Sequence, residues 1–222
     1  MDTCWYLMER KKSYSDERWT NCNLCSRTIV LKILIAGDSF AAQWPGDDGW
    51  VKLLAQKHDV TNVAQAGVSE YKILKQLKTV NLDDYDAFIV SHTSPSRVHT
   101  LQHPLHKEGL HKDCDLIWTD LEGRNSFLNP SLKAAQGYFQ YHYDDHYYQT
   151  IYSLFRKEIY TILHKKKYIS LSHVDIAKAF VWEDNHIDFS DFWKKHKGKQ
   201  NHYSVYGNDK IYKIILDKLK KL

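Results

Sequence analysis

Polar residues that could carry out acyl transfer stand at four separate places in the chain. Ser39 follows one apolar run, Gly67 and Thr93 follow two later ones, and His202 precedes the last amphipathic segment. A serine hydroxyl becomes a useful nucleophile when a histidine within hydrogen-bond reach accepts its proton. An unperturbed imidazole titrates near neutral pH, which suits His202 to that task. The two residues are 163 positions apart, so the elements that carry them decide whether they meet.

Each of these residues also has an ordinary structural explanation. Ser39 could cap the helix that follows it, as serine after a strand often does. Gly67 could serve a turn with positive φ, and Thr93 could be a turn residue ahead of Pro95. His202 could cap or pack. The joint placement of the four residues, more than any single motif, favours a functional role.

The apolar pattern predicts an α/β fold of the flavodoxin-like kind, with three α/β/α layers around a parallel sheet. The predicted strands are 29–36, 59–64, 86–91 and 168–174, and the predicted helices are 48–58, a segment capped by Ser69, a stripe over 151–163 and a C-terminal segment over 211–222. Strands that alternate with helices at short intervals are typical of right-handed parallel crossovers. Ligands bind such sheets outside the carboxyl ends of the strands, where Ser39, Gly67 and Thr93 are expected to fall.

The composition predicts one folded domain with two appendages. The 222 residues are 43% hydrophobic and 14% aromatic, which is enough for a core and unlike a disordered chain. Residues 1–28 are polar and without periodicity, so we expect an N-terminal extension. Residues 98–150 interrupt the regular pattern and are expected to form an insertion or lid within the domain 29–222.

Charge and hydropathy restrict the classes of binding partner and the cellular location that we expect for this protein. The 31 basic residues nearly balance the 27 acidic ones, and no basic stripe with interleaved aromatics is present, which argues against a nucleic-acid partner. No stretch reaches the length that spans a bilayer, and the apolar run 5–8 precedes its charges, unlike a signal peptide. We expect a cytoplasmic protein with no membrane partner, and the oligomeric state is left open.

The cysteines offer a first metal hypothesis. Cys22 and Cys25 form a C-x-x-C pair and, with Cys4, could supply three thiolates. A tetrahedral structural zinc site needs a fourth ligand, and none stands at a suitable spacing. Reduced thiols in an extension are the expected state.

The clustered histidines offer a second metal hypothesis. The spacing of His99, His103 and His106 would place them on one helix face, with His111 further along. Pro104 interrupts that helix, and the carboxylate–histidine pattern of zincins is missing. We therefore expect neither a metal nor a cofactor.

Taken together, the four blocks resemble those of the SGNH, or GDSL-like, hydrolases. The blocks are Gly37-Asp38-Ser39-Phe40, residues 62–69, Ser91-His92-Thr93-Ser94 and Asn201-His202-Tyr203-Ser204-Val205-Tyr206-Gly207-Asn208. The resemblance covers roughly residues 30–95 and 165–222, with 98–150 as an insertion. It implies that Ser39 is the nucleophile and His202 the general base, while Gly67 and Thr93 help to stabilise the oxyanion.

Two departures from that family pattern bear on the chemistry. Thr93 stands where the family has its oxyanion asparagine, and loss of one such donor costs roughly 2.7–4 kcal/mol elsewhere. Lys199 stands three residues before His202, where the family usually has an aspartate. The acid that orients His202 is then Asp188, Asp191 or none, and a base without an orienting acid loses rate.

The resemblance implies a serine-dependent esterase or deacylase that acts through an acyl-enzyme on a small acyl ester, such as an acylated sugar. The departures keep an alternative open, in which a catalytically weakened relative retains the pocket as a binding module. Specificity would come from the insertion, where the aromatic residues over 138–148 could line a sugar or acyl pocket or belong to a helix core.

Overall fold

The computed structural model describes residues 29–44, 49–174, 185–198 and 202–222. The predicted extension 1–28 and the position of Lys199 lie outside the described residues. None of the described helices combines the length and the apolarity that crossing a lipid bilayer requires.

A five-stranded parallel sheet forms the centre of the described chain. Its strands are β1 (Lys32–Gly37), β2 (Asp59–Asn62), β3 (Ala87–His92), β4 (Tyr168–Ser172) and β5 (His186–Asp188). They lie in the order β2-β1-β3-β4-β5, and every neighbouring pair is parallel. This topology confirms the predicted flavodoxin-like α/β class.

The central strands are apolar throughout because both of their faces are covered. Successive side chains of a strand point to opposite faces. In β1, Ile33 and Ile35 belong to one core, while Leu34 and Ala36 belong to the core on the other face. A continuous apolar run, without polar alternation, is the sequence pattern of such a strand.

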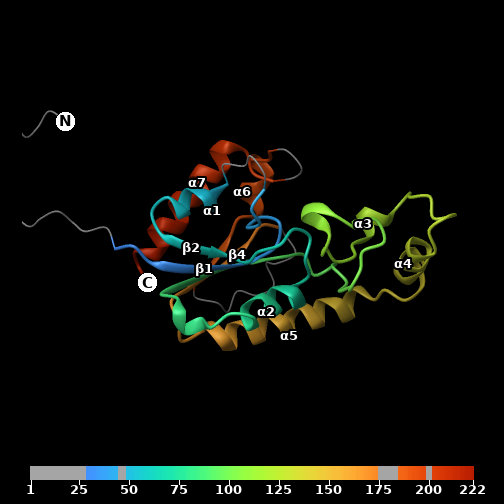
Figure 1. The fold of residues 1–222 in the computed structure, drawn as a ribbon, viewed down its shortest axis with the longest axis horizontal. Helices are drawn as coiled ribbons and strands as arrows, with labels where there is room; N and C mark the ends of the chain where they lie inside the picture. The colour runs from blue at the N-terminus through green and yellow to red at the C-terminus, as the bar shows by residue number, and fades with distance from the viewer. Residues whose placement is uncertain (1–28, 45–48, 175–184, 199–201) are drawn as a thin grey trace, which may run out of the picture.

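Helices cover both faces of the sheet (Figure 1). The α-helices are α1 (Trp50–Ala55), α2 (Glu70–Lys78), α3 (Trp118–Leu121), α4 (Pro130–Tyr141), α5 (Asp145–Leu163), α6 (Ser190–Lys195) and α7 (Val205–Leu219), with short 3-10 helices η1 (Leu82–Asp84) and η2 (Gly109–His111). Helices α1 and α7 pack on one core, and α2 and α5 pack on the other. These two layers and the sheet make up the three-layer architecture.

The predicted insertion lies beyond the carboxyl ends of the strands, where α3 and α4 project from the sheet (Figure 1). It has a small core of its own, formed by Leu121, Leu132 and Ala135. Helix α5 begins at Asp145, inside the predicted insertion, and then runs back along the sheet. The long helix therefore connects the insertion directly to the α/β core.

Two local features differ from the sequence prediction. Strand β5 was not expected, because three residues pairing only with β4 are too few to show a pattern. Ser69 does occupy the N-cap of α2, but its hydroxyl makes no capping hydrogen bond. Its backbone N–H instead donates to Asp115 Oδ2 (2.7 Å), a partner 46 positions away.

Candidate active site

Ser39 lies in a tight turn immediately after β1. The carbonyl oxygen of Asp38 accepts hydrogen bonds from the N–H groups of Ala41 (3.1 Å) and Ala42 (2.9 Å). Asn62, at the end of the neighbouring strand β2, donates from Nδ2 to the Ala41 carbonyl oxygen (2.8 Å). The half-buried Ser39 is therefore held on a turn that two strands secure.

The helix-cap explanation for Ser39 is wrong. Helix α1 begins at Trp50, and Gly49 is its N-cap. Ser39 is separated from that helix by the rest of the loop, so its hydroxyl has no role in starting it.

His202 lies in the loop between α6 and α7. Its carbonyl oxygen accepts a hydrogen bond from the Gly198 N–H (2.5 Å), beside an antiparallel bridge between Lys197 and Tyr203. A Cβ at position 198 would stand 2.5 Å from the Tyr203 carbonyl oxygen, so only glycine fits this close approach. Ser204, not His202, caps α7 with its side chain. The loop thus fixes the backbone that carries His202.

Ser39 and His202 line the same cavity of about 140 Å³, which we call the Ser39 cavity. Its lining also includes Phe40, Trp44, Trp50, Asn62, Tyr203 and Asn208. The His202 ring lies with its centroid 4.6 Å from that of Trp44 and 5.4 Å from that of Phe40. Ser39 and His202 share no direct hydrogen bond in the described chain, and such bonds are often long before a substrate is bound.

The backbone N–H groups of Ser39 and Gly67 donate no hydrogen bond within the described residues, and Gly67 is buried. Gly67 adopts φ +74°, in the left-handed region that favours glycine. Its carbonyl oxygen is held by the Asp115 N–H (2.9 Å) and by Arg97 Nη1 (3.1 Å). Gly67 does not itself line the Ser39 cavity. The turn is fixed, and its amide remains unused.

Thr93 lies apart from the Ser39 cavity, buried at the end of β3. Its N–H donates weakly to Glu70 Oε2 (3.4 Å). Its hydroxyl is close enough to Asp38 to lower the pKa of that carboxyl slightly, without a hydrogen bond of normal geometry. The structure therefore brings Ser39 and His202 to one cavity, whereas Thr93 lies outside that cavity and close to Asp38. The oxyanion role of Thr93 stays a prediction.

Asp38 links β1 to β3 beneath the serine turn, a role that sequence reasoning did not assign. Its Oδ1 accepts hydrogen bonds from Ser91 Oγ and from the Phe40 N–H, both at 3.1 Å. Only 4% of Asp38 is exposed, and this burial raises its pKa to about 6. The carboxyl stiffens the turn at a cost in free energy when it is ionised.

The candidates for the orienting acid have other partners in the described chain. Asp188, at the end of β5, accepts a hydrogen bond from the Ser190 N–H (2.8 Å) at the start of α6. Asp191 pairs with Lys194 at 3.4 Å on the exposed side of α6. The choice among Asp188, Asp191 and no acid remains open.

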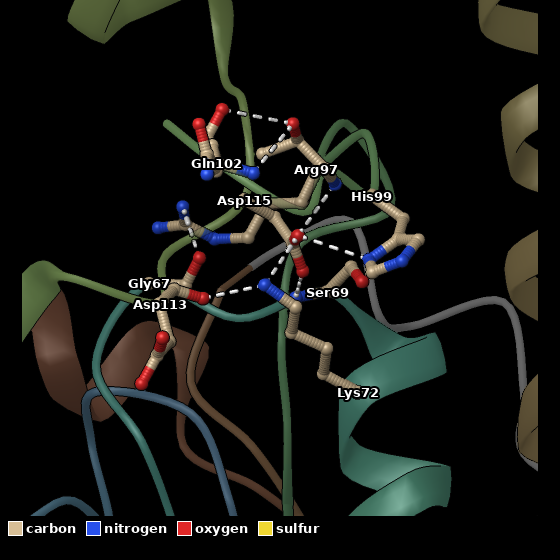
Figure 2. A network of polar contacts seen from close by, with 9 residues as sticks. Gly67, Ser69, Lys72, Arg97, His99, Gln102, Asp113 and Asp115 are labelled. Atoms are coloured by element: carbon tan, nitrogen blue, oxygen red, sulfur yellow. Dashed lines mark hydrogen bonds and ion pairs between the residues drawn. The ribbon is translucent and has the colours of Figure 1, made fainter. Parts of the chain in front are cut away.

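A network centred on Asp115 docks the insertion against the start of α2 and the turn before it (Figure 2). Four donors surround its carboxylate: Ser69 N (2.7 Å), Thr100 N (2.8 Å), Lys72 Nζ (2.9 Å) and His99 Nδ1 (3.2 Å). Burial alone would raise the pKa of Asp115, but these hydrogen bonds outweigh it and lower the pKa. Since the Asp115 N–H also bonds to Gly67, the network sets the position of that turn.

A second cavity of about 290 Å³ opens on the other face of the sheet, between α2, the loop after β3 and α5. Tyr147 and Tyr148, from the aromatic stretch that sequence reasoning singled out, line it together with Tyr152. The rest of that stretch joins α4 to α5, for example through stacking of Tyr143 on Tyr148 (4.9 Å). The aromatic residues therefore serve both a cavity and a helix interface.

No family model, curated protein or solved structure matches this chain. A parallel α/β sheet hosts many unrelated reactions, so the architecture does not name one. Function must be inferred from the residues at the carboxyl edge of the sheet. Asn62 and Asn208 also line the Ser39 cavity. Both fall inside blocks that the sequence singled out, Asn62 in the second and Asn208 at the end of the fourth, but neither was assigned a role there.

Proposed function

We propose that this protein is a serine-dependent ester hydrolase in which Ser39 is the nucleophile and His202 the general base. One observation carries the proposal. These residues, separated by 163 positions, line a single cavity beside the carboxyl edge of the sheet. Parallel α/β sheets bind their ligands at that edge. The resemblance of the four sequence blocks to SGNH hydrolases agrees with this assignment.

The reaction proceeds in two transfers of an acyl group. Ser39 Oγ attacks the ester carbonyl carbon while His202 accepts the hydroxyl proton, and the tetrahedral intermediate collapses as His202 protonates the departing alcohol. Water then attacks the acyl-enzyme and gives its proton to His202. The second collapse releases the carboxylic acid, and the proton returns to Ser39. No cofactor takes part.

The oxyanion is stabilised by backbone donors. The N–H groups of Ser39 and Gly67 have no competing acceptor in the described chain, so they can point at a developing negative charge without first breaking a bond. Donors of this kind act strongly because they are arranged before the reaction begins. Thr93 is the third candidate, and the shift it would need from its place behind Asp38 makes it the weakest of the three.

The size of the Ser39 cavity favours a short acyl group. Its volume of about 140 Å³ is close to the roughly 150 Å³ of an apolar protein cavity that accepts benzene. Phe40, Trp44 and Trp50 provide an apolar lining for such a group. The substrate is then an ester of a small acid, with the alcohol part outside the cavity. We keep the expectation that the protein acts in the cytoplasm.

The decisive test compares the native chain with Ser39→Ala and His202→Ala. Turnover of p-nitrophenyl acetate and labelling by a fluorophosphonate probe are measured, with Ser131→Ala, an exposed serine on α4, as the matched control. Ser39→Ala is expected to abolish labelling and to reduce turnover by at least about 10³-fold. Labelling that persists without Ser39 would overturn the proposal.

A binding module is the second candidate, favoured by Thr93 lying away from the cavity and by the lack of a direct Ser39–His202 hydrogen bond. If neither the native chain nor Ser39→Ala hydrolyses esters, calorimetric titration with short carboxylates such as acetate and butyrate distinguishes the two. Binding that is weakened by Trp44→Ala, without turnover in any variant, would establish recognition in place of catalysis.

A further inference from the structure

Three side chains of metal-binding type converge in the insertion, outside the Ser39 cavity. His103, His106 and Cys114 each present a ligand atom, and these atoms all lie within 4.8 Å of one another. We call this group the histidine–cysteine cluster. His99 does not belong to it, because its Nδ1 lies 3.2 Å from Asp115 Oδ1. Of the four histidines singled out in the sequence, His99 belongs to the Asp115 network, His103 and His106 belong to the cluster, and His111 packs beside His106.

Two more potential ligands border the cluster. The rings of His106 and His111 have centroids 5.3 Å apart, and His106 Nε2 lies 3.8 Å from Asp120 Oδ2. The rings of His103 and His106 are themselves 4.6 Å apart. Five side chains with nitrogen, sulfur or oxygen donors thus gather within a stretch of 18 residues.

The hydrogen bonding of His103 is an independent sign that the cluster expects a ligand. Only 1% of His103 is exposed. Its Nδ1 accepts weak hydrogen bonds from the N–H groups of Leu105 and His106, both at 3.2 Å, while its Nε2 is buried without any hydrogen-bond partner. Buried polar atoms nearly always have a partner. A cation among the three side chains would supply one.

We propose that His103, His106 and Cys114 bind a Zn²⁺ ion, with Asp120 or water as the fourth ligand. Two imidazoles and a thiolate suit the borderline-soft Zn²⁺, whereas Mg²⁺ and Ca²⁺ prefer oxygen ligands. Binding removes the thiol proton of Cys114. Coordination through His103 Nε2 places the ring proton on Nδ1, so the N–H groups of Leu105 and His106 must turn away.

The ion would fasten the insertion to the edge of the sheet. A Cβ at Gly67 would stand 2.7 Å from Cys114 Cβ and 3.6 Å from His111 Nδ1, so the cluster packs directly on that turn. The ring of His111 in turn lies 5.4 Å from that of Trp44, which lines the Ser39 cavity. The site therefore has a positioning role, and its existence does not depend on the ester hydrolase proposal.

The test uses the full chain carrying Cys4→Ser, Cys22→Ser and Cys25→Ser, so that the N-terminal thiols cannot contribute. After dialysis against a chelator, Zn²⁺ is titrated by calorimetry and Co²⁺ by absorption. One equivalent of each is expected to bind, and Co²⁺ is expected to show a thiolate-to-metal charge-transfer band. Binding should raise the midpoint of thermal unfolding, because the ion binds only the folded state.

Variants then separate the site from adventitious binding. His106→Ala removes a half-exposed ligand and should lower the affinity at least 100-fold, while His142→Ala, an exposed histidine outside the cluster, should leave it unchanged. Cys114→Ser should abolish the charge-transfer band, and circular dichroism checks that both variants fold. Failure of the parent to bind one equivalent, or binding that both variants leave intact, would overturn the proposal.

Discussion

The Ser39 cavity and the histidine–cysteine cluster lie near the same edge of the sheet but are built in opposite ways. Ser39 comes from the turn after the first strand and His202 from the loop before the last helix, so the cavity exists only because the whole sheet is assembled. The cluster comes from residues 103–114, a short stretch whose own path brings its side chains together. One site depends on the topology of the domain, and the other depends on a local loop docked against it.

This difference predicts that each site can be damaged without loss of the other, except at the turn they share. Gly67 is that turn. Its backbone N–H is a proposed oxyanion donor, and a Cβ added at this position would stand 2.7 Å from Cys114 Cβ.

The largest expected effect is on turnover, from His202→Ala. Loss of a well-placed general base reduces the rate by about 10²–10⁴-fold. The Zn²⁺ affinity should stay within about threefold of the native value, which is a change of less than roughly 1 kcal/mol in binding free energy. The reason is that His202 is not one of the proposed Zn²⁺ ligands. Steady-state kinetics and calorimetry on the same preparation measure both. Equal loss of both properties would show that the two sites are one.

The next effect is on stability, from Gly67→Ala. The variant puts a Cβ at a positive φ and within 2.7 Å of Cys114 Cβ, and we expect a loss of about 2–3 kcal/mol in unfolding free energy. Gly123→Ala is the matched control, because Gly123 has φ +69° with no atom within 4 Å of the added Cβ. It should cost about 1 kcal/mol, the strain of the backbone alone. Urea unfolding compares the free energies of unfolding of the two variants. Equal losses would mean that Cys114 moves aside without an energetic penalty.

Asp115→Asn should have a moderate effect by loosening the insertion from α2. The amide cannot accept from all the donors around Asp115 Oδ1 and Oδ2, and the Lys72 ammonium loses its counter-charge, so we expect a loss of about 2 kcal/mol. Asp113→Asn, on an exposed neighbouring side chain, should change little. Hydrogen exchange of residues 98–118 would then increase while exchange in β1 and β3 stays protected. Uniform deprotection would contradict a separately docked insertion.

The smallest effect is a difference in pH dependence between Asp38 and Asp115. The folded state raises the pKa of Asp38 from 3.8 to about 6, so it binds the proton more tightly than the unfolded chain. Stability from this group therefore falls as pH rises from about 4 to 6. The pKa of Asp115 is lowered, so its contribution is present above about pH 4 and is lost as pH falls.

Thermal unfolding of Asp38→Asn from pH 4 to 7 measures the first effect. The variant should gain on the native chain as pH rises, because Asn can still accept from Ser91 and Phe40 without becoming charged. Asp115→Asn should lose most at neutral pH and least in acid. Parallel curves for the two variants would contradict the opposite environments of these carboxyls.

Much of the scaffold could be predicted from local pattern alone. The apolar runs before Ser39 and around residues 87–92 predict buried parallel strands, and the apolar run at residues 168–172 predicts β4 for the same reason. The placing of Ser39 at the end of β1 follows from where its run stops. Strand β5 could not be predicted, because its three residues gain their structure from pairing with β4.

The surroundings of the candidate sites were harder to predict. A helical face for His99, His103 and His106 was considered in the sequence, but the described chain has no helix there, and Cys114 replaces His99 in the group. The path of that loop is set by hydrogen bonds to Asp115 and by packing on Gly67, which no periodicity records.

Hydrophobic periodicity is a property of neighbouring residues, and it was sufficient to predict strands β1 to β4, helices α1, α2, α5 and α7, and the edge of the sheet at which the polar side chains follow the strands. Which of those side chains meet is a matter of strand order and loop path. Those depend on contacts between residues tens to more than a hundred positions apart, such as Asn208 Oδ1 with the Trp50 N–H. For that reason folding placed Ser39 and His202 on one cavity and left Thr93 outside it, a difference between the expected site residues that their types and spacing did not show.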